Sequence, residues 1–217
     1  MTSTSSGILD TAMLLDRGPV IPVVVLDDAT RAVPLARALL AGGVDTMEIT
    51  LRTPTALDSI RAVADQVPEM AVGAGTVVSA AQLGEAVDAG AQFVVSPGAT
   101  PTLVDAGLRS GIPLLPGAVT ASDVLGLLEF GIETMKFFPA ATSGGPAALR
   151  ALAGPFPTVR FCPTGGIGPD DAPKYLGLAN VDCVGGSWIA PADLVRAGDW
   201  EQITALCRAT RGLRTAD

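Results

Sequence analysis

Two short stretches place charged side chains among apolar residues, where burial of a charge is unfavourable. Lys136 lies in "GIETMKFFPAA", and Glu48 and Arg52 lie in "MEITLR". The chain has one other lysine, Lys174, and its remaining basic side chains are arginines. Lysine and glutamate are rarely buried unless they are paired, because their charges lose hydration in an apolar interior. These residues are therefore the first candidates for chemistry.

The residue types limit what that chemistry can be. The chain has no histidine, so a general base near neutral pH has to be a carboxylate, a lysine, a tyrosine or a cysteine. A lysine among aromatic and apolar neighbours is more often the free amine, which attacks a ketone to form a Schiff base. Arg52 suits a substrate carboxylate, and Glu48 suits proton transfer. A structural lysine–glutamate ion pair is the alternative explanation for Lys136 and Glu48.

Alternation along the two stretches predicts which way these side chains point. Successive side chains of a strand face opposite sides, so Glu48 and Arg52 share one face and the apolar residues of "MEITLR" share the other. In the same way Lys136 and Phe138 face one side, and their apolar neighbours face the other. In a closed barrel, the polar set would point inward or toward the mouth.

Two glycine-rich turns, "PTGGIGPDD" and "VGGSWIAP", follow the last two strand-like runs. Glycines let backbone N–H groups approach an anion closely, and a following helix N-terminus would add a favourable dipole. The candidate donors are Gly165, Gly166, Gly186 and Ser187. Together with an amine, a carboxylate and a guanidinium, such a cradle indicates imine chemistry on a phosphorylated 2-keto acid.

The elements that would position these groups recur along the chain. Strand-like runs begin near residues 21, 46, 71, 92, 112, 134, 159 and 181, and helical segments such as "RAVPLARALLAGG" separate them. Alternating strands and helices predict a parallel sheet, and eight units predict a (β/α)8 TIM barrel whose active site lies at the carboxyl ends of the strands. We expect one domain over 1–217, an extra helix up to about Arg17 and a closing helical tail from Pro191. An open doubly wound sheet is the alternative, although no GxGxxG follows the first run.

Composition excludes several classes of protein. A net charge of −8 argues against nucleic-acid binding, which needs a basic surface. Three widely spaced cysteines fit reduced thiols in a cytoplasmic protein and lack the spacing of a zinc site. The N-terminus "MTSTSSGILD" has no signal-peptide pattern, and the apolar runs are too short to span a bilayer.

At these residues the sequence resembles the bacterial KDPG/KHG aldolase family, the class I aldolases of 2-keto-3-deoxy-6-phosphogluconate. The resemblance rests on "GGVDTMEITLRTPTALDSIRAV", "VGAGTV", "VVSPG", "LLPGAVT", "MKFFPA", "GPFPTVRFCPTGGI" and "GGSWIAPAD". These motifs occur in family order from about Ile21 to the C-terminal helix. The pair "KFFPA" and "RFCPTGGI" is specific, whereas "GAGT" alone would not be.

The resemblance implies a role for each motif residue. Lys136 matches the Schiff-base lysine and Glu48 the general acid and base. The substrate carboxylate would be held by Arg52 and Thr76 with Pro97 nearby. Phe138 would pack beside the imine, and Thr164 would contact the sugar-derived part of the substrate. The phosphate site would be formed by Gly165, Gly166, Gly186 and Ser187. The family is usually a homotrimer without a metal or other cofactor.

The departures from the family pattern are modest. "ATSGGP" follows "KFFPA" where other members have a glutamate, and "LDDAT" is acidic where some are basic. We interpret Asp27 and Asp28 as helix-capping residues, Lys174 as a solvated helix residue, and Trp188 as a packing residue.

Three other functions fit parts of the pattern. A sugar-phosphate isomerase or epimerase would use Glu48 as a base at carbon and Lys136 only as a charge. A non-catalytic protein would bind a phosphosugar in the glycine-rich turns. A sister aldolase would act on the phosphogalactonate epimer, and Thr164 on its polar turn favours the gluconate substrate.

Overall fold

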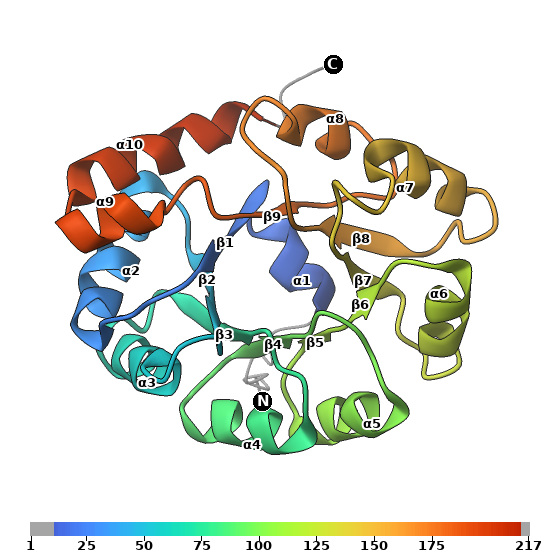
Figure 1. Ribbon diagram of the computed structural model, residues 1–217, viewed down its shortest axis with the longest axis horizontal. Coiled ribbons are helices and arrows are strands. Elements are labelled where there is room, and N and C mark those ends of the chain that lie inside the picture. The colour runs from blue at the N-terminus through green and yellow to red at the C-terminus, as the bar shows by residue number, and fades with distance from the viewer. Residues whose placement is uncertain (1–10, 214–217) are drawn as a thin grey trace, which may run out of the picture.

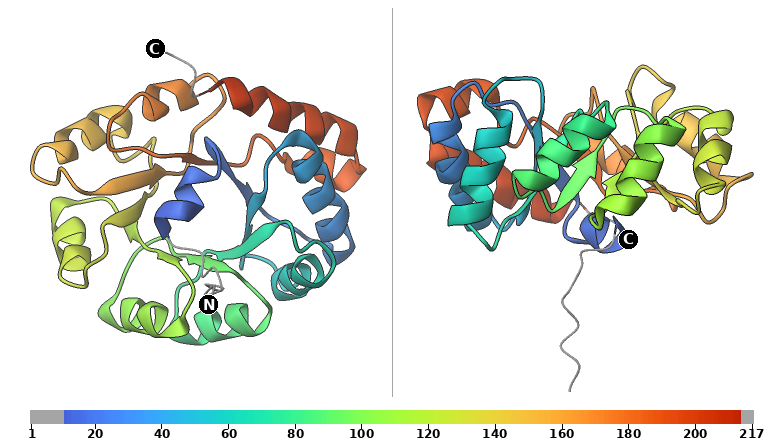
Figure 2. Two further views of the ribbon diagram at one scale, coloured as in Figure 1. Left: turned by 180° about the vertical axis from the view of Figure 1, so that it is seen from behind. Right: turned by 90° about the horizontal axis from the view of Figure 1, so that it is seen from below.

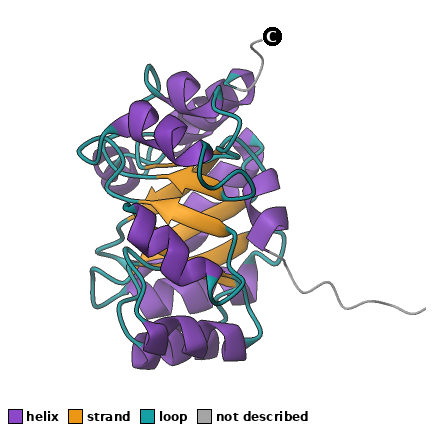
Figure 3. Cartoon of the chain, turned by 90° about the vertical axis from the view of Figure 1, so that its right-hand side faces the viewer, coloured by secondary structure: helices purple, strands orange, loops and turns teal. Residues whose placement is uncertain are grey.

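The structure is a computed structural model that describes residues 11–213, and it shows a closed ring of parallel strands inside a ring of helices. Figure 1 looks along the barrel, and the side view of Figure 3 shows the strands in the centre with helices on both flanks. The predicted (β/α)8 barrel is confirmed. The segment "MTSTSSGILD" lies outside the described residues.

The strands follow the predicted runs closely. They are β1 (Val20–Val24), β2 (Thr46–Thr50), β3 (Ala71–Gly75), β4 (Phe93–Val95), β5 (Leu114–Leu115), β6 (Gly117–Ala118), β7 (Thr134–Phe137), β8 (Arg160–Pro163) and β9 (Val184–Gly186). All pairings are parallel, in the orders β5-β4-β3-β2-β1-β9 and β6-β7-β8. β5 and β6 are two halves of one barrel strand, interrupted at Pro116, which has no N–H to donate.

Two contacts close the ring between β8 and β9. Isolated bridges join Phe161 to Val181 and Thr164 to Gly185. At the start of β8, the guanidinium of Arg160 donates to the carboxylate of Asp182 and to the carbonyl of Ala179, the latter at 2.7 Å. The residues of β8 and β9 therefore lie side by side at the end where the glycine-rich turns follow.

Except for the first, the helices surround the barrel in chain order. They are α1 (Thr11–Asp16), η1 (Ala29–Arg31), α2 (Ala32–Gly42), α3 (Ala56–Gln66), α4 (Ala80–Asp88), α5 (Pro101–Ser110), α6 (Ala121–Leu128), α7 (Gly145–Ala153), α8 (Ala172–Leu176), α9 (Ala192–Ala197), α10 (Trp200–Ala209) and η2 (Thr210–Gly212). None of the helices described is long and apolar enough to cross a membrane.

Local sequence signals set where several helices begin and end. Thr120 caps α6 in a capping box with Asp123, and hydrogen bonds from Thr120 and Val119 outweigh burial and lower the pKa of that carboxyl. Gly43 ends α2 in the left-handed conformation, with φ of 85°. The tail from Pro191 is helical as predicted, but Gly198 divides it into α9 and α10 with φ of 73°.

Apolar residues form two packed clusters. The larger lies between the strands and the surrounding helices. The smaller fills the barrel interior and includes Leu14 and Leu15 of α1 with Phe93, Leu115 and other strand residues. Figure 2 shows α1 at one end of the barrel, and β1 starts directly after it, so α1 closes the end where the strands begin. The predicted extra helix is confirmed, and the opposite end is left for the polar residues.

Candidate active site

Lys136 and Glu48 meet inside the barrel. β2 and β7 lie on opposite sides of the ring in Figure 1, yet Nζ of Lys136 donates to Oε1 of Glu48 at 3.2 Å. Only 4% of the lysine side chain and 3% of the glutamate side chain are exposed. Both charges have lost nearly all their water, so each depends on the other for compensation.

The alternation of β2 and β7 produces this meeting. Met47 and Ile49 face the helices and are fully buried in the outer cluster, whereas Glu48 faces the interior. In β7, Met135 faces the helices and is buried in the outer cluster, and Lys136 points inward. The predicted split of polar and apolar faces is confirmed.

Phe138 lies beside the amine. Its ring centroid is 5.2 Å from Nζ of Lys136, within the range of a cation–π contact. The ring also packs against Gly165, where an added methyl group would lie 3.2 Å from two of the ring carbons. An aromatic ring therefore covers one side of the amine.

Arg52 and Thr76 form a second polar group after β2 and β3. Nε of Arg52 donates to Oγ1 of Thr76 at 3.1 Å, and the Arg52 side chain is exposed. Thr76 has φ of 59°, the one non-glycine residue with positive φ among those described. This conformation is unfavourable for a β-branched residue and is typical of functional sites. The pair leaves the two terminal nitrogens of the guanidinium available for a carboxylate.

Pro97 reaches the same region through its backbone. A methyl group added to Gly117 would overlap the carbonyl of Pro97, so these two segments are in direct contact. Gly117 is the registered partner of Lys136 across β6 and β7. Pro97 is therefore separated from the lysine strand by a single barrel strand, which it contacts at Gly117.

Thr164 connects the lysine strand to the glycine-rich turns. Its N–H donates to the carbonyl of Phe137 at 2.9 Å, and its own carbonyl accepts from the N–H of Ala140 at 2.8 Å. The side chain is buried, with Oγ1 3.4 Å from the carbonyl of Cys162. Gly165 and Gly166 follow with φ of 99° and 73°, which glycine adopts without strain.

The second glycine-rich turn lies next to the first. Gly185 is bridged to Thr164, and Gly186 is registered with Pro22 of β1. Gly186 also faces the ring of Trp188, which packs on the outer cluster and so acts as a packing residue. Ser187 is exposed. The four predicted phosphate-site residues are thus adjacent.

The helices after these turns begin late and are short. α8 starts at Ala172 and has 5 residues, and α9 starts at Ala192 and has 6 residues. If an anion binds here, the loop N–H groups would contribute more than a helix dipole.

Most of the residues expected to have structural roles have them, but of the two predicted capping residues only Asp28 is a helix cap. Asp28 caps η1 by accepting from the N–H of Thr30 at 2.9 Å, while Asp27 is exposed. Lys174 lies on the exposed surface of α8 and pairs with Asp171 at 2.6 Å. The cysteines are buried and form no disulfide, and burial raises the pKa of the Cys207 thiol to about 11, which makes it a poor nucleophile near neutral pH.

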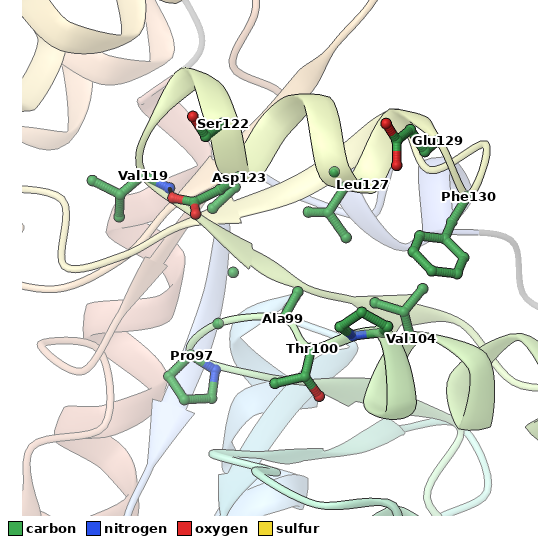
Figure 4. Close-up of a pocket in the computed structure, with 15 residues that line it drawn as sticks. Pro97, Ala99, Thr100, Val104, Val119, Ser122, Asp123, Leu127, Glu129 and Phe130 are labelled. Atoms are coloured by element: carbon green, nitrogen blue, oxygen red, sulfur yellow. Dashed lines mark hydrogen bonds between the residues drawn. The ribbon is translucent and has the colours of Figure 1, made fainter.

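A separate cavity of about 460 Å³ lies between α5 and α6 (Figure 4). Pro97, Thr100, Asp123 and Phe130 are among its lining residues, whereas Lys136 and Glu48 are not. Asp123 is already committed to capping α6. The cavity therefore borders the site on the Pro97 side without containing the buried pair.

One residue of the site was missed by the sequence reasoning. Gly75, at the end of β3, faces the carboxylate of Glu48. Its signal was a glycine inside the strand-like run "AVGAGTV", which often marks a close approach.

Known proteins resemble this chain in sequence and in fold. The family model described as KDPG and KHG aldolase matches residues 12–206. The chain is 52% identical over 195 residues to the 2-dehydro-3-deoxy-phosphogluconate aldolase of Pseudoalteromonas atlantica, a match covering 90% of this chain and 91% of the relative. It is equally similar, at 52%, to the KHG/KDPG aldolase of Escherichia coli, with coverage of 90% and 92%.

A solved structure shares the whole fold. The KDPG aldolase of Legionella pneumophila, with pyruvate captured as a covalent carbinolamine intermediate, superposes with a TM-score of 0.91. The two sequences are 45% identical, and the match covers 93% of this chain and 98% of the other.

Proposed function

Because the chain belongs to the KDPG and KHG aldolase family, we propose that Lys136 is the Schiff-base lysine with which this class I aldolase cleaves 2-keto-3-deoxy-6-phosphogluconate. The products are pyruvate and glyceraldehyde 3-phosphate. The observation that carries the assignment is the buried Lys136–Glu48 contact of 3.2 Å, which places a base beside the only interior lysine among the residues described.

Imine formation begins with a proton transfer within the pair. Glu48 takes a proton from the ammonium of Lys136, and the free amine attacks the C2 ketone. Glu48 returns that proton to the carbinolamine hydroxyl, which leaves as water. The resulting protonated imine has no oxygen at C2 and withdraws electrons from the C3–C4 bond.

Carbon–carbon cleavage uses the same carboxylate again. Glu48 accepts the proton of the C4 hydroxyl, the C3–C4 bonding electrons move into the imine, and glyceraldehyde 3-phosphate leaves. Glu48 then gives its proton to C3 of the enamine, and water hydrolyses the imine to release pyruvate and Lys136. General acid–base catalysis of this kind contributes about 10²–10⁴-fold in rate.

The remaining residues hold the two ends of the substrate. Arg52 and Thr76 bind the carboxylate next to the imine carbon, with Pro97 on the same side. Phe138 excludes water from the imine, and Thr164 contacts the hydroxyl-bearing carbons. The phosphate binds the N–H groups of the loops that contain Gly165, Gly166, Gly186 and Ser187.

The proposal includes the second substrate named for the Escherichia coli relative. Cleavage of 4-hydroxy-2-oxoglutarate gives pyruvate and glyoxylate by the same imine steps. That substrate has no phosphate, so it would not use the glycine-rich turns. Substitutions in those turns should therefore affect it less.

We also propose that 1–217 acts as one aldolase domain, in a cytoplasmic homotrimer. Support comes from the family resemblance and, for the location, from three cysteines that form no disulfide. Light scattering that gives a monomer mass at micromolar concentration would contradict the trimer.

Borohydride trapping tests the assignment of the lysine. The protein is incubated with pyruvate, reduced, digested and mapped by mass, and we expect a pyruvyl adduct on Lys136 and none on Lys174. A folded protein without an adduct would contradict imine chemistry, and the isomerase would then become the better explanation.

A further inference from the structure

Gly75 lies directly against the carboxylate that performs the proton transfers of the proposed mechanism. It is the last residue of β3, whose neighbour β2 carries Glu48. A methyl group added to Gly75 would lie 2.5 Å from Cγ and 2.6 Å from Cδ of Glu48, and closer still to Oε1. Carbon atoms in ordinary contact are about 3.5–4.0 Å apart. The space that a side chain would fill at position 75 is therefore occupied by Glu48.

Backbone conformation does not explain this glycine. Gly75 is absent from the residues with positive φ, and β3 is regular to its end. Alanine can adopt this strand geometry and normally stabilises a strand relative to glycine by about 0.5–1 kcal/mol. The three atoms nearest to an added methyl group all belong to Glu48, so contact with this side chain is what first opposes a larger residue here.

The contact between Gly75 and Glu48 involves the carboxylate oxygen that faces Lys136. Oε1, the oxygen nearest the missing methyl group, is the one that accepts from Nζ of Lys136 at 3.2 Å. A side chain at position 75 would push this oxygen sideways in an interior where Glu48 is only 3% exposed. Since the interior is closely packed, displacement of this oxygen would disturb its contact with the lysine.

We propose that Gly75 is a positioning residue, which holds the Glu48 carboxylate at Lys136 by leaving the space that it occupies. The inference rests on the proposed function, because it concerns the proton transfers of the imine mechanism. Gly75 itself touches no reacting atom. Its effect should appear in the steps that Glu48 performs and not in the ability of the chain to fold.

Gly75→Ala is the direct test. We expect kcat for cleavage to fall about 10²-fold, the effect of a misplacement of about 1 Å, with KM changed less than about threefold. Exchange of the pyruvate methyl hydrogens in D₂O reports proton transfer at C3, and it should slow by a similar factor. Borohydride should still trap pyruvate on Lys136, because the amine remains. An unchanged kcat and exchange rate would overturn the proposal.

Gly73→Ala is the matched steric control. It adds the same methyl group to the same strand, where it would meet the ring of Phe93. We expect lower stability, but an unchanged exchange rate per trapped adduct. If this ratio falls as far as in Gly75→Ala, packing of β3 and not the Glu48 contact is responsible.

A Glu48→Ala variant into which Gly75→Ala is introduced tests whether the effect of Gly75→Ala depends on its contact with Glu48. With the carboxylate removed, the methyl group at position 75 has nothing to displace, so adding Gly75→Ala should cause less than about a twofold further loss. A further loss as large as in the wild-type background would overturn the proposal. If Gly75→Ala alone fails to fold, the proposal requires the double variant to fold, and failure of both overturns it.

The two proposals can fail separately. Absence of a pyruvate adduct in the unaltered protein contradicts the aldolase mechanism. An adduct with normal exchange in Gly75→Ala contradicts only the role of Gly75.

Discussion

The two lysines of this chain occupy opposite environments, although each contacts one carboxylate. Lys136 contacts Glu48, which is 88 positions away in the sequence, across the barrel. The side chain of Lys136 is 4% exposed and that of Glu48 is 3% exposed. Lys174 meets Asp171 one helical turn away, with side chains that are 66% and 51% exposed. The exposed contact is the shorter of the two, at 2.6 Å against 3.2 Å.

This difference shows that burial, and not the distance between nitrogen and oxygen, decides how much an ion pair contributes to stability and reactivity. Exposed pairs contribute little because water and salt screen them. A buried pair has lost hydration on both sides, so removal of one partner leaves a charge without compensation. The same loss of water lets an amine react and makes a carboxylate an effective base. The following predictions test the comparison by altering the two pairs in parallel.

The largest contrast should come from removing each amine. Lys136→Met should abolish aldol cleavage and the borohydride adduct, because no other group at the site can form an imine. Lys174→Met makes the same substitution on the surface and should leave activity within about twofold of the unaltered protein. A steady-state assay with pyruvate detection measures both. Turnover by the Lys136 variant would exclude the Schiff-base role.

Removing the charge of each carboxylate should give the next contrast. Glu48→Gln should lower kcat about 10²–10⁴-fold, because proton transfer is lost while the lysine remains. Pyruvate should still be trapped on Lys136 during long incubation. Asp171→Asn is the surface counterpart, and its kcat should be unchanged. Equal kcat values for Glu48→Gln and the unaltered protein would mean that another group moves the protons.

The free energy of unfolding should also distinguish the buried ion pair from the exposed one. Lys136→Met leaves the Glu48 charge buried alone, so the free energy of unfolding should fall by about 3–5 kcal/mol. The double variant Lys136→Met/Glu48→Leu should recover most of that loss, since it removes both charges. Urea denaturation measures the free energy for both variants. A double variant no more stable than the single one would show that the loss comes from packing.

Most of the fold could be predicted from the sequence, because the signals are local. Runs of β-rich residues separated by helical segments define the strands, and all eight barrel strands were located. Two details differ from the predicted runs. Pro116 divides one strand, and β9 begins at Val184 and not at 181.

The site was predictable in composition and not in geometry. Alternation within each strand placed Glu48 and Lys136 on inner faces, which the structure confirms. Their distance depends on the relative register and tilt of strands far apart in the ring, which no local pattern encodes. Gly75 was missed for the same reason, because its importance comes from a side chain on the neighbouring strand.

The smallest expected effect concerns the surface pair at high pH. The hydrogen bond from Lys174 to Asp171 raises the pKa of the lysine above its ordinary value of 10.5. A folded-state pKa above the unfolded value means that the contribution to stability is complete below about pH 10 and is lost as pH rises through the folded-state pKa. Lys174→Met should therefore differ slightly in Tm from the unaltered protein at pH 8 in low salt, and the difference should vanish in 1 M salt or above the folded-state pKa. A Tm difference independent of both salt and pH would mean that Lys174 acts through packing of its methylene groups, and the comparison between the two lysines would then no longer be one of charge.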